Sequence, residues 1–279
     1  MTRTTDAAGT RRPLVLTQML ASRRRSTLWW SVGMAFLVLV VIASYPSVRD
    51  SAEGFESYLE SLPEGFAELV GAEGGIAAPA GYLNSQMYSN MYPLLLIVLG
   101  ISAASWAVAG SEGEGTLEML LANPVTRSRV AVERLAGVVV LTGAVSLAAT
   151  VVLVLTAPVV ELTGLPSGAL WAAGLGSWTL ALCFAGVSFG VGAATGSKAA
   201  AIGSGSAAAA GTYVLYGLSA FVQAIEPVRW LSPWFWFLDS DPLTGVTSTF
   251  WVQGVLLPLA VGALFSVAGV AVLVRRDLH

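Results

Sequence analysis

Residues 136–160 of the chain read AGVVVLTGAVSLAATVVLVLTAPVV, and no residue in this run is charged. A helix needs about 20 mainly apolar residues to cross the hydrocarbon core of a bilayer. Because the run exceeds that length without interruption, Ala136–Val160 predicts a membrane-spanning helix.

Five further stretches have the same character, and none carries Asp, Glu, Lys or Arg in its interior. They are Leu28–Tyr45, Met91–Gly110, Leu170–Ala194, Ala200–Val222 and Phe250–Val274. The fifth in chain order is the least apolar, because residues 203–206 read GSGS. Gly186 and Gly190 lie four residues apart, as do Gly192 and Gly196, a spacing that lets helix backbones approach closely without identifying the partner helix. The sequence therefore predicts an all-α integral membrane protein, with six transmembrane helices in one domain over residues 1–279.

The composition of the chain excludes several classes of protein. Hydrophobic residues make up 55% of the 279 residues and charged residues only 11%, whereas a soluble domain carries about 25% charged residues. Because so few residues are charged, the expected surroundings of the chain are membrane lipid. The net charge of −3 leaves no basic domain that could bind a nucleic acid. With one cysteine, Cys183, and one histidine, His279, neither a His/Cys metal site nor a Ser-His-Asp or Cys-His catalytic device is expected.

The basic residues orient the predicted spans, since cytoplasmic loops carry an excess of Lys and Arg. With both termini in the cytoplasm, Arg49 and Arg229 alone among the 14 basic residues lie outside. The inner segments are then residues 1–27, 111–135, 195–199 and 275–279. An even number of spans is required by this arrangement, and six satisfies it.

Residues outside the spans predict short amphipathic helices. Residues 1–27 predict a cytoplasmic interface helix, most clearly over 13–26, with residues 1–12 equally compatible with a tail held near lipid by its arginines. In the extracellular segment, residues 46–90, apolar and acidic residues alternate at helical spacing, and Pro63 divides them into two helices. This segment fits a lid over the spans, although a solvated packing element explains it better. Polar and aromatic residues near the outer end of the second span could contact cargo, but an interfacial position explains them better. They are Asn84, Gln86, Tyr88, Asn90 and Tyr92, and the same interpretation applies to Trp230, Trp234, Trp236 and Trp251.

The cytoplasmic segment between the second and third spans, residues 111–135, predicts a helix, a turn and a second helix. Ser111 and Glu114 match a capping box at the helix start. Asn123-Pro124 ends the first helix, because a residue before proline avoids helical geometry, and Thr126 can cap the next one. Such a pair fits either a docking surface or an interfacial hairpin.

The run Glu114–Leu121 (EGTLEMLL), followed by Pro124–Arg127 (PVTR), resembles the signature of ABC-2 type export permeases. Three more features resemble elements of that family in the expected order. They are the Tyr58-Leu59…Leu62-Pro63 element, the run Leu231-Ser232-Pro233-Trp234, and the ending Arg275-Arg276-Asp277-Leu278.

The resemblance implies the membrane permease subunit of an ATP-driven exporter, acting in the cytoplasmic membrane of a prokaryote. A separate ABC ATP-binding subunit would bind ATP and Mg and contact this segment. A second permease chain, identical or a close paralogue, would complete the complex. Carried onto this sequence, the contact residues are Glu112, Glu114, Gly115, Thr116, Leu117, Glu118, Leu120, Leu121, Pro124, Arg127 and Arg129.

Two features of the sequence also indicate that a partner would supply the free energy for transport. The nearest approach to a phosphate-binding loop, Gly196-Ser197-Lys198-Ala199, lacks the adjacent Gly-Lys-Ser/Thr of a P-loop. No carboxylate lies inside a predicted span to relay protons or bind sodium. The apolar spans favour a hydrophobic or amphipathic cargo, such as a drug-like compound or a lipid. A passive channel or secondary transporter is the alternative; an intramembrane enzyme lacks any visible catalytic constellation.

Overall fold

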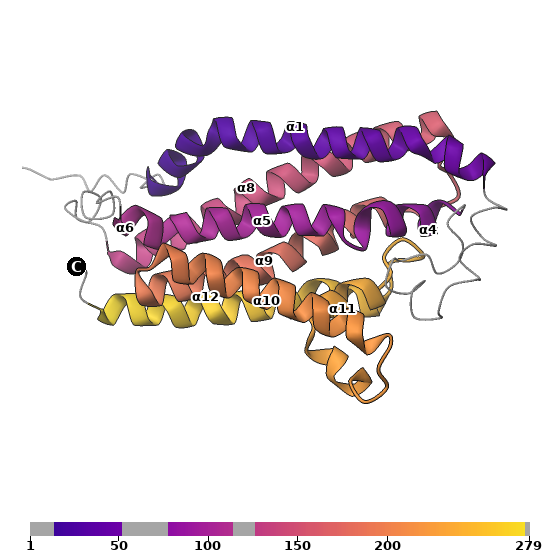
Figure 1. Cartoon of the computed structure of the whole chain (residues 1–279). Coiled ribbons are helices and arrows are strands. Elements are labelled where there is room, and N and C mark those ends of the chain that lie inside the picture. Colours follow the sequence, from indigo (N-terminus) through magenta and orange to yellow (C-terminus); the bar gives the residue numbers. More distant parts are fainter. Residues whose placement is uncertain (1–13, 52–77, 114–125, 277–279) are drawn as a thin grey trace, which may run out of the picture.

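The computed structural model of the chain describes residues 14–51, 78–113 and 126–276, and these residues are helical apart from short connections (Figure 1). The longer helices are α1 (Leu14–Asp50), α5 (Met91–Ser105), α8 (Arg127–Thr156), α9 (Ala169–Thr195), α10 (Lys198–Ser219) and α12 (Leu257–Arg275). The shorter α-helices are α4 (Pro79–Leu83), α6 (Ser111–Gly113) and α11 (Pro233–Asp239). The π-helical segments are η1 (Asn84–Tyr88), η2 (Trp106–Gly110) and η5 (Phe250–Leu256), and η3 (Ala157–Val160) and η4 (Glu226–Leu231) are 3-10 helices.

Five helical runs in the described residues are long and apolar enough to cross a membrane. They are Val15–Asp50, Pro79–Gly113, Arg127–Val160, Ala169–Thr195 and Phe250–Arg275, and they contain five of the six predicted stretches. Most of the remaining stretch, Ala200–Val222, lies in the helix α10, which ends at Ser219 and is not among the five. The all-α prediction is confirmed, and the count of six spans stays a prediction.

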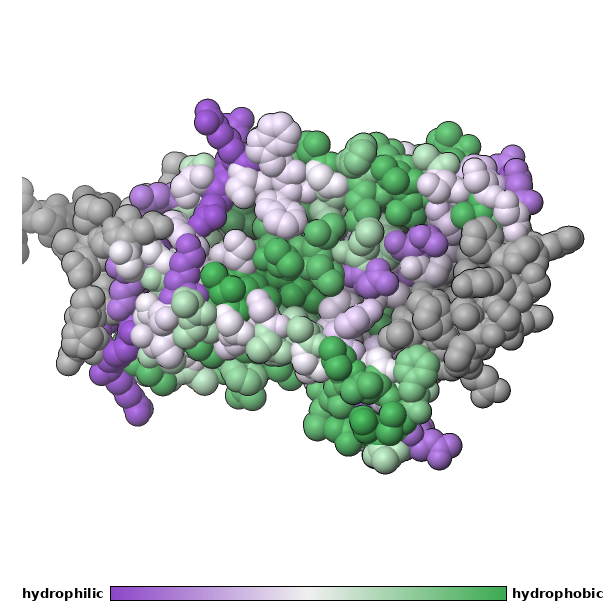
Figure 2. Space-filling view, in the orientation of Figure 1, coloured by the Kyte–Doolittle hydropathy of each residue, from purple (hydrophilic) through white to green (hydrophobic). Residues whose placement is uncertain are grey.

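Helix α9 is the centre of the bundle. It packs against α12, α5, α10 and α8, whereas α1 packs mainly on α8 at the edge of the molecule (Figure 1). In an apolar stretch of 18 residues, 72% of the residues of α9 are buried in the bundle, compared with 22% for α1. Hydrophobic side chains cover the middle of the visible face and hydrophilic ones gather toward the end that carries α6 and the C-terminal end of α12 (Figure 2).

Glycines bring α9 and α12 into backbone contact. A β-carbon added at Gly186 would overlap the carbonyl oxygen of Gly262, and one added at Gly269 would overlap that of Gly190. The close backbone approach expected from glycine spacing is therefore confirmed for Gly186 and Gly190. It was wrong for Gly192 and Gly196, because Gly192 faces side chains and Gly196 lies in the turn after α9. Since the two backbones touch directly, α9 and α12 form one tightly packed pair.

Helix α1 joins two elements that the sequence analysis separated. It runs without a break from Leu14 to Asp50, so residues 14–27 are continuous with the first span rather than a separate interface helix. It also passes through Pro46, where the span was expected to have ended. Proline removes the backbone donor that would bond the Ile42 carbonyl. The Tyr82 hydroxyl donates to the neighbouring Val41 carbonyl at 2.5 Å. Residues 1–13 of the predicted interface segment and residues 52–77 of the predicted extracellular segment lie outside the described residues.

Three aromatic residues interpreted as interfacial are buried in the bundle, so that prediction was wrong for them. Tyr88, Tyr92 and Trp234 are each at most 2% exposed. The Tyr92 hydroxyl donates to the Ser146 carbonyl at 3.0 Å, and Trp234 Nε1 donates to the Ala209 carbonyl at 3.1 Å. Internal carbonyl acceptors explain the burial of these two residues, since a polar aromatic group can enter an apolar core once it is hydrogen-bonded.

Candidate functional site

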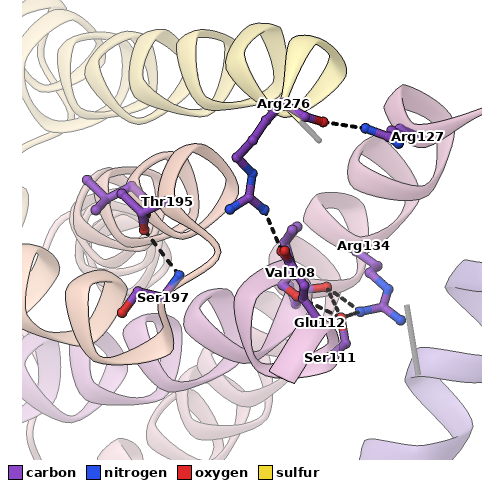
Figure 3. Close-up of polar contacts among 10 residues, drawn as sticks. Val108, Ser111, Glu112, Arg127, Arg134, Thr195, Ser197 and Arg276 are labelled. Atoms are coloured by element: carbon purple, nitrogen blue, oxygen red, sulfur yellow. Dashed lines mark hydrogen bonds and ion pairs between the residues drawn. The ribbon is translucent and has the colours of Figure 1, made fainter. Parts of the chain in front are cut away.

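Four parts of the chain meet at one end of the bundle. They are the end of α6, the start of α8, the turn between α9 and α10, and the end of α12 (Figure 3). The first two flank residues 114–125, which lie outside the described residues and hold most of the predicted contact residues. The described residues that border this segment are Gly113 before it and Thr126 after it.

Arg276, directly after α12, binds both flanks of that segment. Its Nη2 lies 2.5 Å from Oε2 of Glu112 in α6, and Arg127, the first residue of α8, donates from Nη1 to the Arg276 carbonyl at 2.5 Å (Figure 3). The ion pair is largely buried, with side-chain exposures of 21% for Arg276 and 9% for Glu112. Partial burial protects such a pair from the screening that weakens exposed ion pairs.

The contact between Arg127 and Arg276 has a simple electrostatic cause. The last carbonyls of a helix have no intrahelical partner and carry partial negative charge. The Arg276 carbonyl lies at the C-cap of α12, so the guanidinium of Arg127 satisfies one of these acceptors. The start of α8 and the end of α12 are thereby joined.

Gly196, in the turn between α9 and α10, lies under the guanidinium of Arg276. A β-carbon at this position would overlap Arg276 Nη1, and the backbone has φ +68°, which favours glycine. Next to it, the Ser197 N–H donates to Thr195 Oγ1 at 3.2 Å, and Ser197 Oγ caps α10 by accepting from the Ala200 N–H (Figure 3). Glycine therefore allows Arg276 to contact the turn while it binds Glu112.

Arg134 is a buried cation two turns into α8, with an exposure of 4%. Its Nη1 donates to the Ala107 carbonyl and to Ser111 Oγ, and its guanidinium lies 5.4 Å from the ring centre of Trp106. Ala107 belongs to the π-helical segment η2, whose geometry departs from the i→i−4 ladder of an α-helix. Arg134 therefore attaches α8 to the last turns before the segment 114–125.

The capping role predicted for Ser111 was wrong. Ser111 continues the helical run from η2 into α6, and its hydroxyl donates to the Val108 carbonyl at 2.8 Å. Its φ of −75° and ψ of −25° are helical, whereas an N-cap residue has extended backbone geometry. The serine is buried and accepts from Arg134, a role that a local sequence motif does not reveal.

The cap predicted for Thr126 is confirmed, since its Oγ1 accepts from the Arg129 N–H at 3.4 Å. Arg129 also lies 2.8 Å from Glu133. The other carboxylate oxygen of Glu133 accepts from the backbone N–H groups of Val15 and Leu16, at 3.1 and 3.2 Å. A carboxylate at a helix N-terminus satisfies free donors and opposes the helix dipole, so Glu133 fixes the start of α1 to α8.

Three of the predicted contact residues, Glu112, Arg127 and Arg129, lie together at this end of the bundle. The other eight, namely Glu114, Gly115, Thr116, Leu117, Glu118, Leu120, Leu121 and Pro124, lie outside the described residues. Sequence reasoning missed the roles of Arg134, Glu133 and Arg276. The signal for Arg134 and Glu133 was a charge close to an apolar run, and Arg276 was noted only within the ending that resembles the family's tail. Among the residues that the structure describes, no three His, Cys, Asp or Glu side chains gather to hold a metal ion.

A second feature is an apolar groove of about 540 Å³ between α8 and α9. Its lining includes Val140, Leu147, Trp171 and Trp178, together with Gly143. The polar groups near it are satisfied internally, as when Trp178 Nε1 donates to Thr142 Oγ1 at 3.0 Å. The volume falls in the range of roughly 300–1,000 Å³ typical of small-molecule pockets.

The chain was compared with known protein families and curated proteins. No curated protein matches it significantly. The model of the ABC-2 family transporter protein matches residues 16–233, a range that includes most of α1, both flanks of the segment 114–125, and the turn between α9 and α10. Permeases of this family lack nucleotide-binding domains, so the family implies an ATP-binding partner. Because the match covers more than half of its length, this chain belongs to the ABC-2 transporter family and is a multi-pass membrane permease.

Proposed function

We propose that the chain is the permease subunit of an ATP-driven exporter, and that residues Glu112–Arg129 dock on a separate ATP-binding subunit. One observation carries this proposal: both flanks of the segment are bound to Arg276, through Glu112 and Arg127. A segment that transmits force from a partner needs ends fixed to the spans. The ATP and Mg would be bound by the partner.

The proposed topology has six spans with both termini in the cytoplasm. Helix α10 has 22 residues, or about 33 Å at 1.5 Å per residue, which is enough to cross a hydrocarbon core of about 30 Å. Arg23–Arg25 near the start of α1 and the basic residues at the start of α8 and the end of α12 lie at the end of the bundle that carries α6, whereas Arg49 lies at the opposite end. The rule that cytoplasmic ends are basic supports placing the α6 end in the cytoplasm. The membrane would be the cytoplasmic membrane of a prokaryote.

A second permease chain, identical or a close paralogue, completes the proposed complex. Helix α5 is otherwise central, yet Met91, Leu94 and Val98 form a stripe along it that is about half exposed. These residues are three and four positions apart and therefore share one face of the helix. The apolar stripe supports coverage of α5 by a second chain.

The proposed cargo is a hydrophobic or amphipathic molecule, such as a drug-like compound or a lipid. The groove between α8 and α9 supports an apolar cargo, because its walls are aliphatic and aromatic and its nearby polar groups already have partners. An ion would find no compensating charge among these lining residues. The alternative function, a passive channel or a secondary transporter, would need no ATPase.

Reconstitution separates the two functions. The chain is placed in liposomes alone, with its ATPase subunit, or with that subunit carrying a substituted phosphate-binding lysine. A rhodamine dye and a short-chain fluorescent phospholipid serve as probes. We expect ATP-dependent movement of at least one probe only with the active ATPase subunit. Movement of the same probe by the isolated chain at an equal rate would instead support the channel.

A further inference from the structure

Arg276 contacts three other parts of the bundle through its side chain and its backbone carbonyl. Its guanidinium binds Glu112 of α6 and lies over Gly196 in the turn between α9 and α10, and its carbonyl accepts from Arg127 of α8. Several helices of the bundle therefore converge on one residue at the end of α12. Figure 3 shows the side chain reaching from the end of α12 toward Glu112.

The helix that carries Arg276 is attached to the centre of the bundle. Beyond the glycine contacts of Gly186 with Gly262 and of Gly190 with Gly269, Thr179 Oγ1 of α9 donates to the Gly254 carbonyl at 2.6 Å. Close-packed backbones transmit displacement instead of absorbing it. A displacement of the end of α12 is therefore expected to move α9, which is in contact with α5, α8 and α10.

We propose that Arg276 is a positioning residue that transmits movement of the segment 112–129 to the α9–α12 pair. The proposal rests on the function proposed above, in which an ATPase moves that segment. The direct link is the pair formed by Glu112 and Arg276, because it is the largely buried ion pair between the segment's first flank and α12. The Arg127 contact adds a second link from the other flank.

The neighbouring residue provides a matched control. Arg275 is also a cation at the end of α12, but it is exposed to solvent, whereas Arg276 is mostly buried. Replacing either residue by alanine removes the same charge from the same helix end. A difference between the two variants therefore reports the contacts of Arg276 and not the general charge of the surface.

The test uses the full complex of permease and ATPase in lipid nanodiscs. Ser248, exposed just before η5 at the far end of the α12 run, is replaced by cysteine, and its labelling rate with an aqueous maleimide is measured with and without a nonhydrolysable ATP analogue. We expect the nucleotide to change the rate at least about threefold in the Ser248→Cys background. Arg276→Ala removes the pair with Glu112 but keeps the backbone carbonyl that accepts from Arg127, so it should reduce the change to less than half. Arg275→Ala should preserve the change, and both variants should retain co-purification of the ATPase.

A charge exchange keeps the test informative if Arg276→Ala fails to fold. The single variant Glu112→Arg should likewise reduce the nucleotide-dependent change to less than half, and the double variant Glu112→Arg with Arg276→Glu should restore it to at least half. A change of at least half the parent value in Arg276→Ala, an equal loss in Arg275→Ala, or no nucleotide effect in the Ser248→Cys parent would each overturn the proposal. Failure of the parent permease to bind any ATPase subunit would instead reject the proposed function.

Discussion

The carboxylate of Glu112 lies 2.5 Å from the guanidinium of Arg276, although the two residues are 164 positions apart. One follows the second long apolar run and the other follows the last, so the ion pair joins distant parts of the chain at one surface. The same surface holds Arg127 and Gly196. The two ends of the proposed coupling segment, residues 112–129, are therefore held by tertiary contacts as well as by the covalent chain.

Removal of the buried Arg134 side chain should destabilise the protein. The variant Arg134→Met loses charged hydrogen bonds to the Ala107 carbonyl and Ser111 Oγ, and we expect a loss of about 2–4 kcal/mol. The measurement is thermal unfolding of the detergent-solubilised protein. Arg24→Met, at an exposed position of α1, is the matched control and should unfold near the parent temperature. Equal stability of the two variants would contradict a structural role for Arg134.

Glycine substitutions should separate the α9–α12 contact from simple helix propensity. In Gly186→Ala the new β-carbon overlaps the Gly262 carbonyl, and we expect a destabilisation of about 1–3 kcal/mol or more. Gly203 of α10 has no atom within 4 Å of such a carbon, so Gly203→Ala should be neutral or stabilising by up to about 1 kcal/mol. Thermal unfolding of both variants is the measurement. A stabilised Gly186→Ala would show that α9 and α12 do not touch through their backbones.

The sequence predicts the membrane helices well because each one is marked by a run of about 20 apolar residues, which can be recognised from composition alone. The stretch 136–160 and four of its five counterparts lie inside long helical runs of the structure. The helix cap was predicted correctly at Thr126 and wrongly at Ser111. Ser111 continues a helix, and its hydroxyl accepts a hydrogen bond from Arg134. A capping motif describes only neighbouring residues, whereas burial depends on a helix that arrives later in the chain.

The contacts of the candidate site are the part that sequence reasoning could not supply. Arg276 and Arg134 each have partners on other helices, and the identity of those partners depends on how the helices pack. Tyr92 was misplaced at the membrane interface for the same reason, because its acceptor, the Ser146 carbonyl, lies on α8. The resemblance to the family indicated where the proposed coupling segment lies, but not which residues hold its ends.

The proposed topology predicts opposite labelling at the two ends of α8. In intact cells, a membrane-impermeant maleimide should label Ser167→Cys, which is exposed in the connection before α9. Ser128→Cys, near the start of α8, should be labelled only after lysis. The native Cys183 is 1% exposed and should stay unlabelled in both variants. Labelling of Ser128→Cys alone in intact cells would reverse the orientation, and labelling of both would rule out a span between them.

The most direct test of the central claim is co-purification of the ATPase subunit with a permease altered in the segment itself. The variant Glu118→Arg with Leu121→Asp reverses one charge and removes one apolar anchor of the proposed contact, and such anchors carry most of the energy of protein interfaces. The matched control is Glu226→Arg with Leu231→Asp, the same changes at exposed residues of η4. We predict that both variants insert in the membrane and that only the first loses the ATPase subunit, by at least about tenfold. Equal retention of the subunit and coupled transport by the first variant would contradict docking through this segment.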